Sequence, residues 1–171
     1  MRHATILVLA ALATLIAIEG RAQQAPADHG SAAAAGAKHD ASAHKIVMPD
    51  SIKWEDVKSL PPGAKMVVLE GDPTKEGFVA FRIKLPANYR IPPHFHPCPE
   101  RVTVLSGTLH LGMGENADER AATALPAGAY TSMPPEMRHF AWTEGETVLQ
   151  LATIGPWGIT YVNPADDPRK K

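Results

Sequence analysis

The sequence has only one cysteine, Cys98, so no disulfide can form within the chain. Its formal net charge is −1 at pH 7, a balance that gives no electrostatic footprint for nucleic acid or an anionic membrane. The longest apolar run, residues 4–18, has 15 residues, fewer than the roughly 18–20 that a membrane-spanning helix needs. Beyond this run, no ten-residue stretch repeats apolar side chains at the helical period. Stability must therefore come from a non-helical core and from any metal that the chain binds.

Residues 1–22 have the pattern of a secretory signal peptide. Arg2 gives a basic start, the apolar run follows, and Gly20 and Ala22 place small residues at the minus-three and minus-one positions of a cleavage site. We expect cleavage after Ala22 and a periplasmic or secreted protein with no membrane attachment. An uncleaved N-terminal anchor is the alternative.

Residues 23–45 are rich in Ala, Gly, Ser, Asp and His and contain no large apolar residue. Such a segment cannot bury enough apolar surface to offset its ordering entropy, so we predict a disordered linker. Its histidines are incidental in this interpretation; in the alternative one they bind metal ions weakly. We expect one folded domain at residues 46–165 and a polar C-terminal tail at residues 166–171.

The 16 prolines and 13 glycines of the chain indicate many turns between short strands. Within residues 78–85, the apolar residues Val79, Phe81, Ile83 and Leu85 occupy every second position, so this set should face the core. Further strands are expected at 66–70, 89–96, 100–105, 108–113, 122–125, 130–133, 139–143, 147–154 and 159–162. Many short strands with Pro and Gly punctuation predict an all-β fold, a sandwich or a small β-barrel.

The stretch HFHPCPERVTVLSG, residues 94–107, contains candidate metal ligands. Side chains of a strand alternate between its faces, so His94 and His96 point the same way, with Cα atoms about 6.5 Å apart. Two imidazoles at that spacing can reach one ion at about 2.0–2.2 Å. Glu100 has the same parity and reaches back if the chain bends at the intervening prolines. His139 would come from a neighbouring strand, and the combined set suits Fe, Mn, Ni, Cu or Zn.

Two motifs in the chain resemble the signatures of the cupin superfamily. Residues 94–107 read H-x-H-x(3)-E-x(6)-G, as in the first signature. Gly128, Pro134 and His139 have the spacing of the second signature, G-x(5)-P-x-G-x(2)-H-x(3)-N. The resemblance covers roughly residues 66–154, and the closing segment 155–169 is similar to that of small, single-domain, exported bacterial cupins.

The resemblance implies a jelly-roll β-barrel with one metal site. Its ligands would be the two histidines and the glutamate of the first motif and the histidine of the second, here His94, His96, Glu100 and His139. Cupins commonly pair by strand exchange or by packing barrel against barrel, so the resemblance also implies a homodimer.

Three positions depart from the cupin signatures. Asn88 replaces the glycine expected six positions before the first histidine, and asparagine tolerates a left-handed backbone better than most residues. In the second signature, Glu136 replaces the second glycine and Thr143 replaces the asparagine.

Two further residues of the core domain, Cys98 and His110, have side chains that can bind metal or react. Cys98 is either a soft additional ligand or redox-sensitive thiol, or a small buried residue between two prolines, and we favour the buried residue. His110 lies on an expected strand and faces either the cavity or solvent.

Aromatic and cationic residues near the motifs are candidates for pocket lining. Phe140, Trp142, Trp157 and Tyr161 would line a pocket for an apolar ligand or belong to the core. Of the two arginines that would meet an anionic substrate, Arg90 and Arg101, the second lies on the strand face opposite Glu100.

Three functions suit such a site. The first is a metal-dependent oxygenase, or a related oxidoreductase, that acts on a small molecule. The second is an exported module that binds a metal or small ligand without turnover, and the third is a metal-dependent sugar isomerase. The fold alone does not choose among them.

Overall fold

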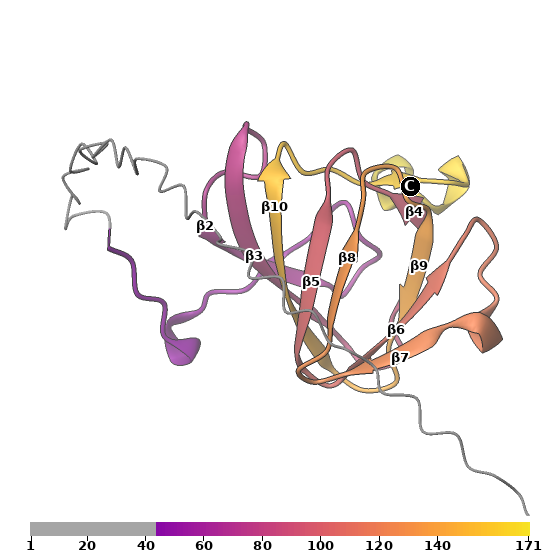
Figure 1. The fold of residues 1–171 in the computed structure, drawn as a ribbon, viewed down its shortest axis with the longest axis horizontal. Helices are drawn as coiled ribbons and strands as arrows, with labels where there is room; N and C mark the ends of the chain where they lie inside the picture. Colours follow the sequence, from indigo (N-terminus) through magenta and orange to yellow (C-terminus); the bar gives the residue numbers. More distant parts are fainter. Residues whose placement is uncertain (1–43) are drawn as a thin grey trace, which may run out of the picture. The chain divides into compact units, whose positions relative to one another are not determined.

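The computed structural model describes residues 44–171, which form a barrel of two antiparallel β-sheets (Figure 1). The all-β jelly-roll barrel expected from the sequence is confirmed. The expected signal peptide and the expected linker up to residue 43 lie outside the described residues. Within residues 44–171, no helix is long and apolar enough to cross a membrane.

The larger sheet has six strands in the order β1-β2-β3-β10-β5-β8. Because β10 pairs antiparallel with both β3 and β5, a late segment of the chain lies between two early ones. The bounds are β1 (Glu55–Asp56), β2 (Lys65–Glu70), β3 (Gly77–Leu85), β5 (Glu100–Ser106), β8 (Tyr130–Met133) and β10 (Thr147–Gly155).

The smaller sheet has five strands in the order β11-β4-β9-β6-β7. In Figure 1 it lies across from the larger sheet, and the tight turn between β5 and β6 joins the two. The bounds are β4 (Arg90–Phe95), β6 (Thr108–Met113), β7 (Thr123–Pro126), β9 (His139–Trp142) and β11 (Thr160–Tyr161). Four short 3₁₀ turns complete the described part: η2 (Pro49–Ser51), η3 (Glu119–Ala121), η4 (Pro164–Asp166) and η5 (Pro168–Lys170).

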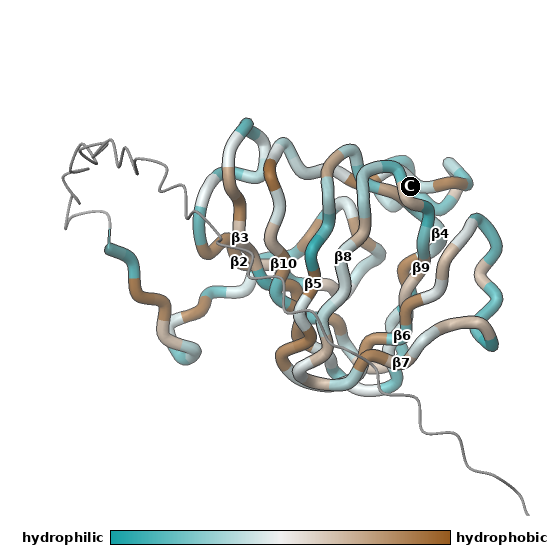
Figure 2. Tube along the Cα trace, in the orientation of Figure 1, coloured by the Kyte–Doolittle hydropathy of each residue, from teal (hydrophilic) through white to brown (hydrophobic). Residues whose placement is uncertain are grey.

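The core lies between the two sheets, and β3 shows how the sequence builds it. Val79, Phe81, Ile83 and Leu85 are all buried, which confirms the predicted core face of this strand. Across the pair with β10, Ile83 is opposite Leu149 and Phe81 is opposite Leu151. Figure 2 shows apolar residues along the strands, whereas the loop between β6 and β7 is mainly hydrophilic. Alternation along each strand therefore fixes which face is buried.

The expected strands match the structure to within one residue at each end. The last one, expected at 159–162, consists of Thr160 and Tyr161, the two residues that pair with β4. The two-residue strand β1 was not expected from the sequence. It pairs with β2 through two residue partners, too few to produce a period in the sequence.

A loop of residues 57–64 is tied to the barrel by two tyrosines. The Tyr161 hydroxyl donates a hydrogen bond to the carbonyl of Ser59 at 2.8 Å, and the Tyr89 hydroxyl donates to the carbonyl of Pro61. Leu60 of this loop is 3% exposed and packs in the core. These contacts hold the loop over the barrel interior.

Candidate metal centre

The four candidate ligands come from three strands and one bend. His94 lies in β4 and His139 begins β9, and the two are direct partners in the ladder between these strands. His96 follows the last residue of β4, and Glu100 begins β5. All four are buried, between 3% and 7% exposed.

The bend between β4 and β5 carries the chain from one sheet to the other. β4 belongs to the smaller sheet and β5 to the larger one, so His94 and Glu100 approach the centre from opposite layers of the barrel. The sequence predicts a bend here, because the prolines at 97 and 99 cannot donate ladder hydrogen bonds. The structure adds that this bend is the crossover between sheets, which brings the carboxylate to face the imidazoles.

The imidazoles converge on one point. One ring nitrogen from each of His94, His96 and His139 lies within 4.8 Å of the others, an arrangement that can hold a metal ion. The Glu100 Oε2 atom is 3.4 Å from His96 Nε2 and 3.3 Å from His139 Nε2. The structure thus brings all four sequence-predicted residues together.

Backbone carbonyls orient all three imidazoles. The Nδ1 atom of His94 is 2.7 Å from the carbonyl oxygen of Pro92, and that of His139 is 2.9 Å from the carbonyl oxygen of Met137. The Nδ1 atom of His96 is 2.6 Å from the carbonyl oxygen of Gly158. A carbonyl only accepts, so each Nδ1 must carry the proton, which leaves Nε2 as the ligand atom of a neutral ring.

One buried atom of the centre lacks a hydrogen-bond partner. Among the described residues nothing forms a hydrogen bond with His96 Nε2, because its approach to Glu100 does not have hydrogen-bond geometry. A buried nitrogen lone pair without a donor is costly, of the order of 1–3 kcal/mol. One ring nitrogen from each of the three histidines, beside a carboxylate, is the donor set of a first-row transition metal, so these residues fit a metal.

The pKa values of His94, His96 and Glu100 are shifted so that they favour the forms that bind a cation. Burial, with the neighbouring imidazoles His139 and His96, lowers the pKa of His94 to about 3. Burial likewise lowers the pKa of His96. Burial alone would raise the pKa of Glu100, but the close contact with His139 and the adjacent imidazoles outweigh it and lower that pKa. The neutral imidazole and the ionised carboxylate are the forms that bind metal.

The candidate ligands line a cavity inside the barrel. It leaves about 40 Å³ for the centres of water-sized molecules, whereas one water needs roughly 10–15 Å³. Its other lining residues are mostly aliphatic and include Leu60 from the loop described above. The centre therefore sits in a small, mainly apolar space.

The three departures from the cupin signatures keep the local backbone. Asn88 has φ of 56° and Glu136 has φ of 62°, so both adopt the left-handed conformation for which glycine is favoured. Thr143, which is 2% exposed, donates a hydrogen bond to the carbonyl of Pro86 at 2.7 Å. Its hydroxyl also accepts one from the backbone N–H of Tyr89 at 3.2 Å. The threonine thus fastens the turn that precedes β4.

Cys98 and His110 both lie away from the convergence point. Cys98 is a buried free thiol in the crossover bend, and the three-imidazole group does not include it. The His110 ring stacks on Trp142, with ring centroids 3.7 Å apart and planes 9° apart, and neither residue lines the cavity. The interpretation of Cys98 as a small buried residue agrees with this placement.

Of the other candidate pocket residues, all but one lie outside the cavity lining. Arg90 and Arg101 are exposed, and Arg90 forms an ion pair with Glu119. Phe140 is buried on the face of β9 opposite His139 and does not line the cavity. Tyr161 has its ring centroid 6.1 Å from that of His94.

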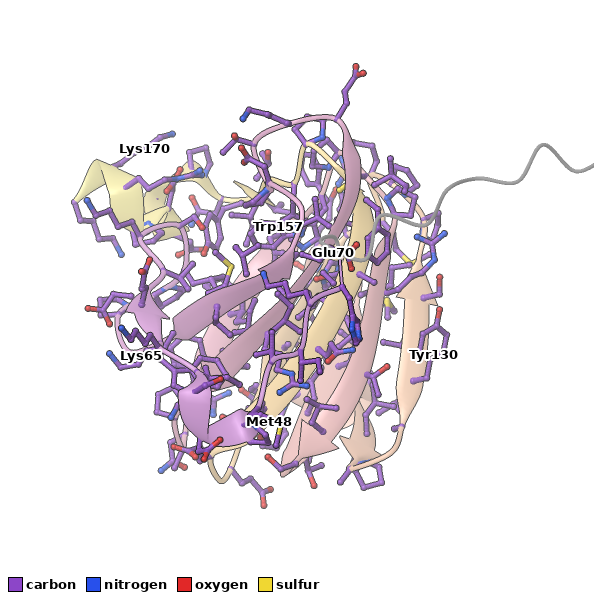
Figure 3. All side chains as sticks on the ribbon, turned by 90° about the vertical axis from the view of Figure 1, so that its left-hand side faces the viewer. Met48, Lys65, Glu70, Tyr130, Trp157 and Lys170 are labelled. Atoms are coloured by element: carbon purple, nitrogen blue, oxygen red, sulfur yellow. The ribbon has the colours of Figure 1, made fainter. Side chains whose placement is uncertain are left out.

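Of the four candidate aromatic residues, Trp157 is the one that lines the cavity. It stacks on His96, with ring centroids 5.3 Å apart and planes 20° apart. In Figure 3 it lies near the middle of the barrel, whereas Tyr130 stands at its edge. The sequence marks it only as a possible lining residue, because no local period connects it to His96.

The chain belongs to the family described as "Domain of unknown function (DUF4437)", whose model matches residues 25–166. Its fold is the one found in cupins, as the two motifs predict. No curated protein matches the chain significantly.

Solved structures with the same fold share little sequence with this chain. The polyketide cyclase RemF from Streptomyces resistomycificus has a TM-score of 0.62 at 20% identity and covers 74% of this chain and 91% of its own. A putative acetylacetone dioxygenase from Methylibium petroleiphilum PM1 has a TM-score of 0.56 at 17% identity, over 73% and 85% of the two chains. An RmlC-like cupin from Shewanella frigidimarina NCIMB 400 has a TM-score of 0.53 at 18% identity, over 65% and 90%. At these identities the likeness establishes the fold alone.

Proposed function

We propose that His94, His96, Glu100 and His139 bind one divalent first-row transition metal ion: Fe, Mn, Ni, Cu or Zn. The observation that carries the proposal is the convergence of three buried imidazoles, each held through Nδ1 by a backbone carbonyl. Glu100 would be the fourth ligand, because its Oε2 lies beside two of these nitrogens. The carboxylate also supplies the negative charge that a buried divalent cation requires.

We further propose that the protein is a metal-dependent oxygenase, or a related oxidoreductase, acting on a small molecule. Four protein ligands leave open positions on an ion that prefers six, and a bound ion supplies Lewis acidity and, for Fe, Mn or Cu, electron transfer. The chain contributes fixed imidazoles and a mainly apolar cavity. Among the solved structures, the acetylacetone dioxygenase and the polyketide cyclase differ in chemistry, so the shared fold does not choose the reaction.

A module that binds a metal or small ligand without turnover is the second candidate. The cavity lining favours it, because apart from the four ligands and Trp157 no lining residue among residues 44–171 carries a polar side chain that could take part in a reaction. The sugar isomerase is the weakest candidate, since an aliphatic wall offers few partners for several hydroxyl groups.

Metal analysis and oxygen uptake of the purified mature protein separate these candidates. An oxygenase should contain a redox-active metal near one equivalent and consume oxygen with some member of a panel of catechols, thiols and dicarboxylates. Iron or manganese at one equivalent without turnover across the panel would favour the binding module. Conversion of a sugar without oxygen uptake, followed by NMR, would favour the isomerase.

Replacing one ligand tests the site itself. The variant His96→Ala should lose nearly all bound metal, because it removes an imidazole fixed by Gly158. Substitution of His110, which lies outside the cavity, by Ala is the control and should leave the stoichiometry unchanged. Full metal content in His96→Ala would show that the site assignment is wrong.

We also propose that the protein is exported and, from its resemblance to cupins, that it forms a homodimer. Export is supported by the signal-like pattern of residues 1–22 and by the predicted cleavage after Ala22. Mass spectrometry of the cell-fractionated protein should find a mature chain that begins at Gln23. Light scattering coupled to gel filtration gives the oligomeric state.

A further inference from the structure

The wall of the metal cavity is almost entirely apolar. Apart from the four candidate ligands, Trp157 is the one lining residue among residues 44–171 that carries a polar side-chain hydrogen. The rest are aliphatic or thioether side chains such as Leu85, Val102, Leu111 and Met133. Within the described residues, no lysine or arginine reaches this wall.

The indole N–H of Trp157 has no acceptor. Its Nε1 atom is buried, and none of the described residues accepts a hydrogen bond from it. The ring is fixed on two sides, because it stacks on His96 and contacts Phe81 edge-on with ring centroids 5.0 Å apart. The backbone N–H of Trp157 donates to the carbonyl of Pro73 at 2.8 Å, which fixes the main chain as well. A donor that is buried, rigid and unpaired carries a desolvation cost that an acceptor would remove.

The position of the Trp157 ring connects it to the metal site. Trp157 and His96 are stacked partners, and the two residues carry buried side-chain nitrogens that lack a hydrogen-bond partner. A metal would satisfy His96 Nε2, and an oxygen of a molecule bound to that metal would satisfy the indole N–H. The metal and its bound ligand together would thus complete both atoms.

We infer that Trp157 is a specificity-determining residue whose indole N–H donates a hydrogen bond to an oxygen of the metal-bound ligand. The inference rests on the proposed metal site. The ligand class that fits is a small molecule with one oxygen-bearing, metal-chelating end and an apolar body. A small diketone or a related enol has this form.

The same wall disfavours two other classes of ligand. A dicarboxylate would place its second charge against aliphatic side chains without a cationic partner. A sugar would bury several hydroxyl groups, for which the wall offers a single donor. The wall therefore selects for a ligand whose polar atoms all lie close to the ion.

Titration of the cobalt-loaded mature protein with acetylacetone, succinate and xylose tests this inference through the visible spectrum of the metal. Acetylacetone should bind more tightly than succinate, and xylose should not perturb the spectrum. Trp157→Phe keeps the ring but removes the N–H, and it should weaken acetylacetone about three- to tenfold with unchanged cobalt stoichiometry. Trp142→Phe is the matched control, because Trp142 Nε1 is also buried and unpaired but Trp142 does not line the cavity.

A second measurement uses the unaltered protein. In the zinc-loaded protein with ¹⁵N-labelled tryptophan, acetylacetone should shift the Trp157 indole resonance and leave that of Trp142 in place. Equal affinity of wild type and Trp157→Phe, an unmoved Trp157 resonance, or succinate binding as tight as acetylacetone would overturn the inference while leaving the metal site intact. A wild-type protein that binds no cobalt would overturn both the proposed metal site and the inference about Trp157.

Discussion

The imidazole tautomers are set residue by residue. His94 and His139 each hydrogen-bond through Nδ1 to the carbonyl two residues earlier in the chain, so their strands orient them locally. His96 instead depends on Gly158, more than sixty residues later. The orientation of His96 is therefore the part of the centre that requires the closed barrel.

The buried histidines make the metal-free protein sensitive to acid. The pKa of His94 is about 3 in the folded protein, whereas the unfolded chain has the ordinary value of about 6.5. Between these values the unfolded state binds the extra proton, so stability is full above about pH 6.5 and is lost as pH falls toward 3.

Denaturant titrations of the chelator-treated protein at several pH values check this prediction. The unfolding free energy should rise with pH by up to about 1.4 kcal/mol per pH unit from His94 alone. The lowered pKa of His96 adds to this slope in the same direction. His94→Gln should remove the His94 share of the slope. A stability that does not change across this range would contradict the burial assigned to these rings.

At the scale of elements, turns decide how the strands meet. The turn between β5 and β6 joins the two sheets, and Gly107 holds it with φ of 76°. A Cβ atom at this position would lie 2.5 Å from the carbonyl oxygen of Glu146 and 2.9 Å from the Cα atom of Thr147. The left-handed backbone and the close approach both require glycine here.

Gly107→Ala should destabilise the fold by about 2 kcal/mol or more, since the left-handed conformation alone costs roughly 1–2 kcal/mol. Gly145→Ala is the control, because a Cβ there meets no atom within 4 Å and its φ is not in the left-handed region. We expect its effect to stay within about 0.5 kcal/mol. Urea unfolding measures both, and equal effects would refute the role given to the turn.

At the scale of the whole molecule, the candidate centre ties the two sheets together. His94 and His139 belong to the smaller sheet, Glu100 belongs to the larger one, and His96 lies in the crossover between them. One ion bound to all four would cross-link the layers. Because the unfolded chain holds no preformed site, the binding free energy would add to the stability of the fold.

Metal loading should therefore raise the unfolding free energy by about 2.7 kcal/mol when free metal is 100 times its dissociation constant. Calorimetry with and without chelator measures the shift, which should amount to several degrees or more in Tm. His96→Ala should show no shift with the same ion. A metal-independent Tm in the wild type would contradict the cross-link.

Local patterns in the sequence account for much of the fold. The alternation in residues 78–85 predicts the buried face of β3, because a strand side chain has only two directions to point. The prolines near Cys98 predict a bend, because they cannot donate ladder hydrogen bonds. The two-residue strand β1 could not be predicted, because its pairing to β2 leaves no period.

The sequence by itself determined the all-β class, the barrel and the four residues that gather at its centre. It could do so because strand alternation and motif spacing are local, and the resemblance to cupins supplied the partner of the first motif. Only the tertiary structure decided that Glu100 faces the imidazoles from the opposite sheet, that Gly158 orients His96, and that Trp157 leaves an unpaired donor beside it. These features join residues far apart in the chain, and such contacts exist only once the two sheets have closed on each other.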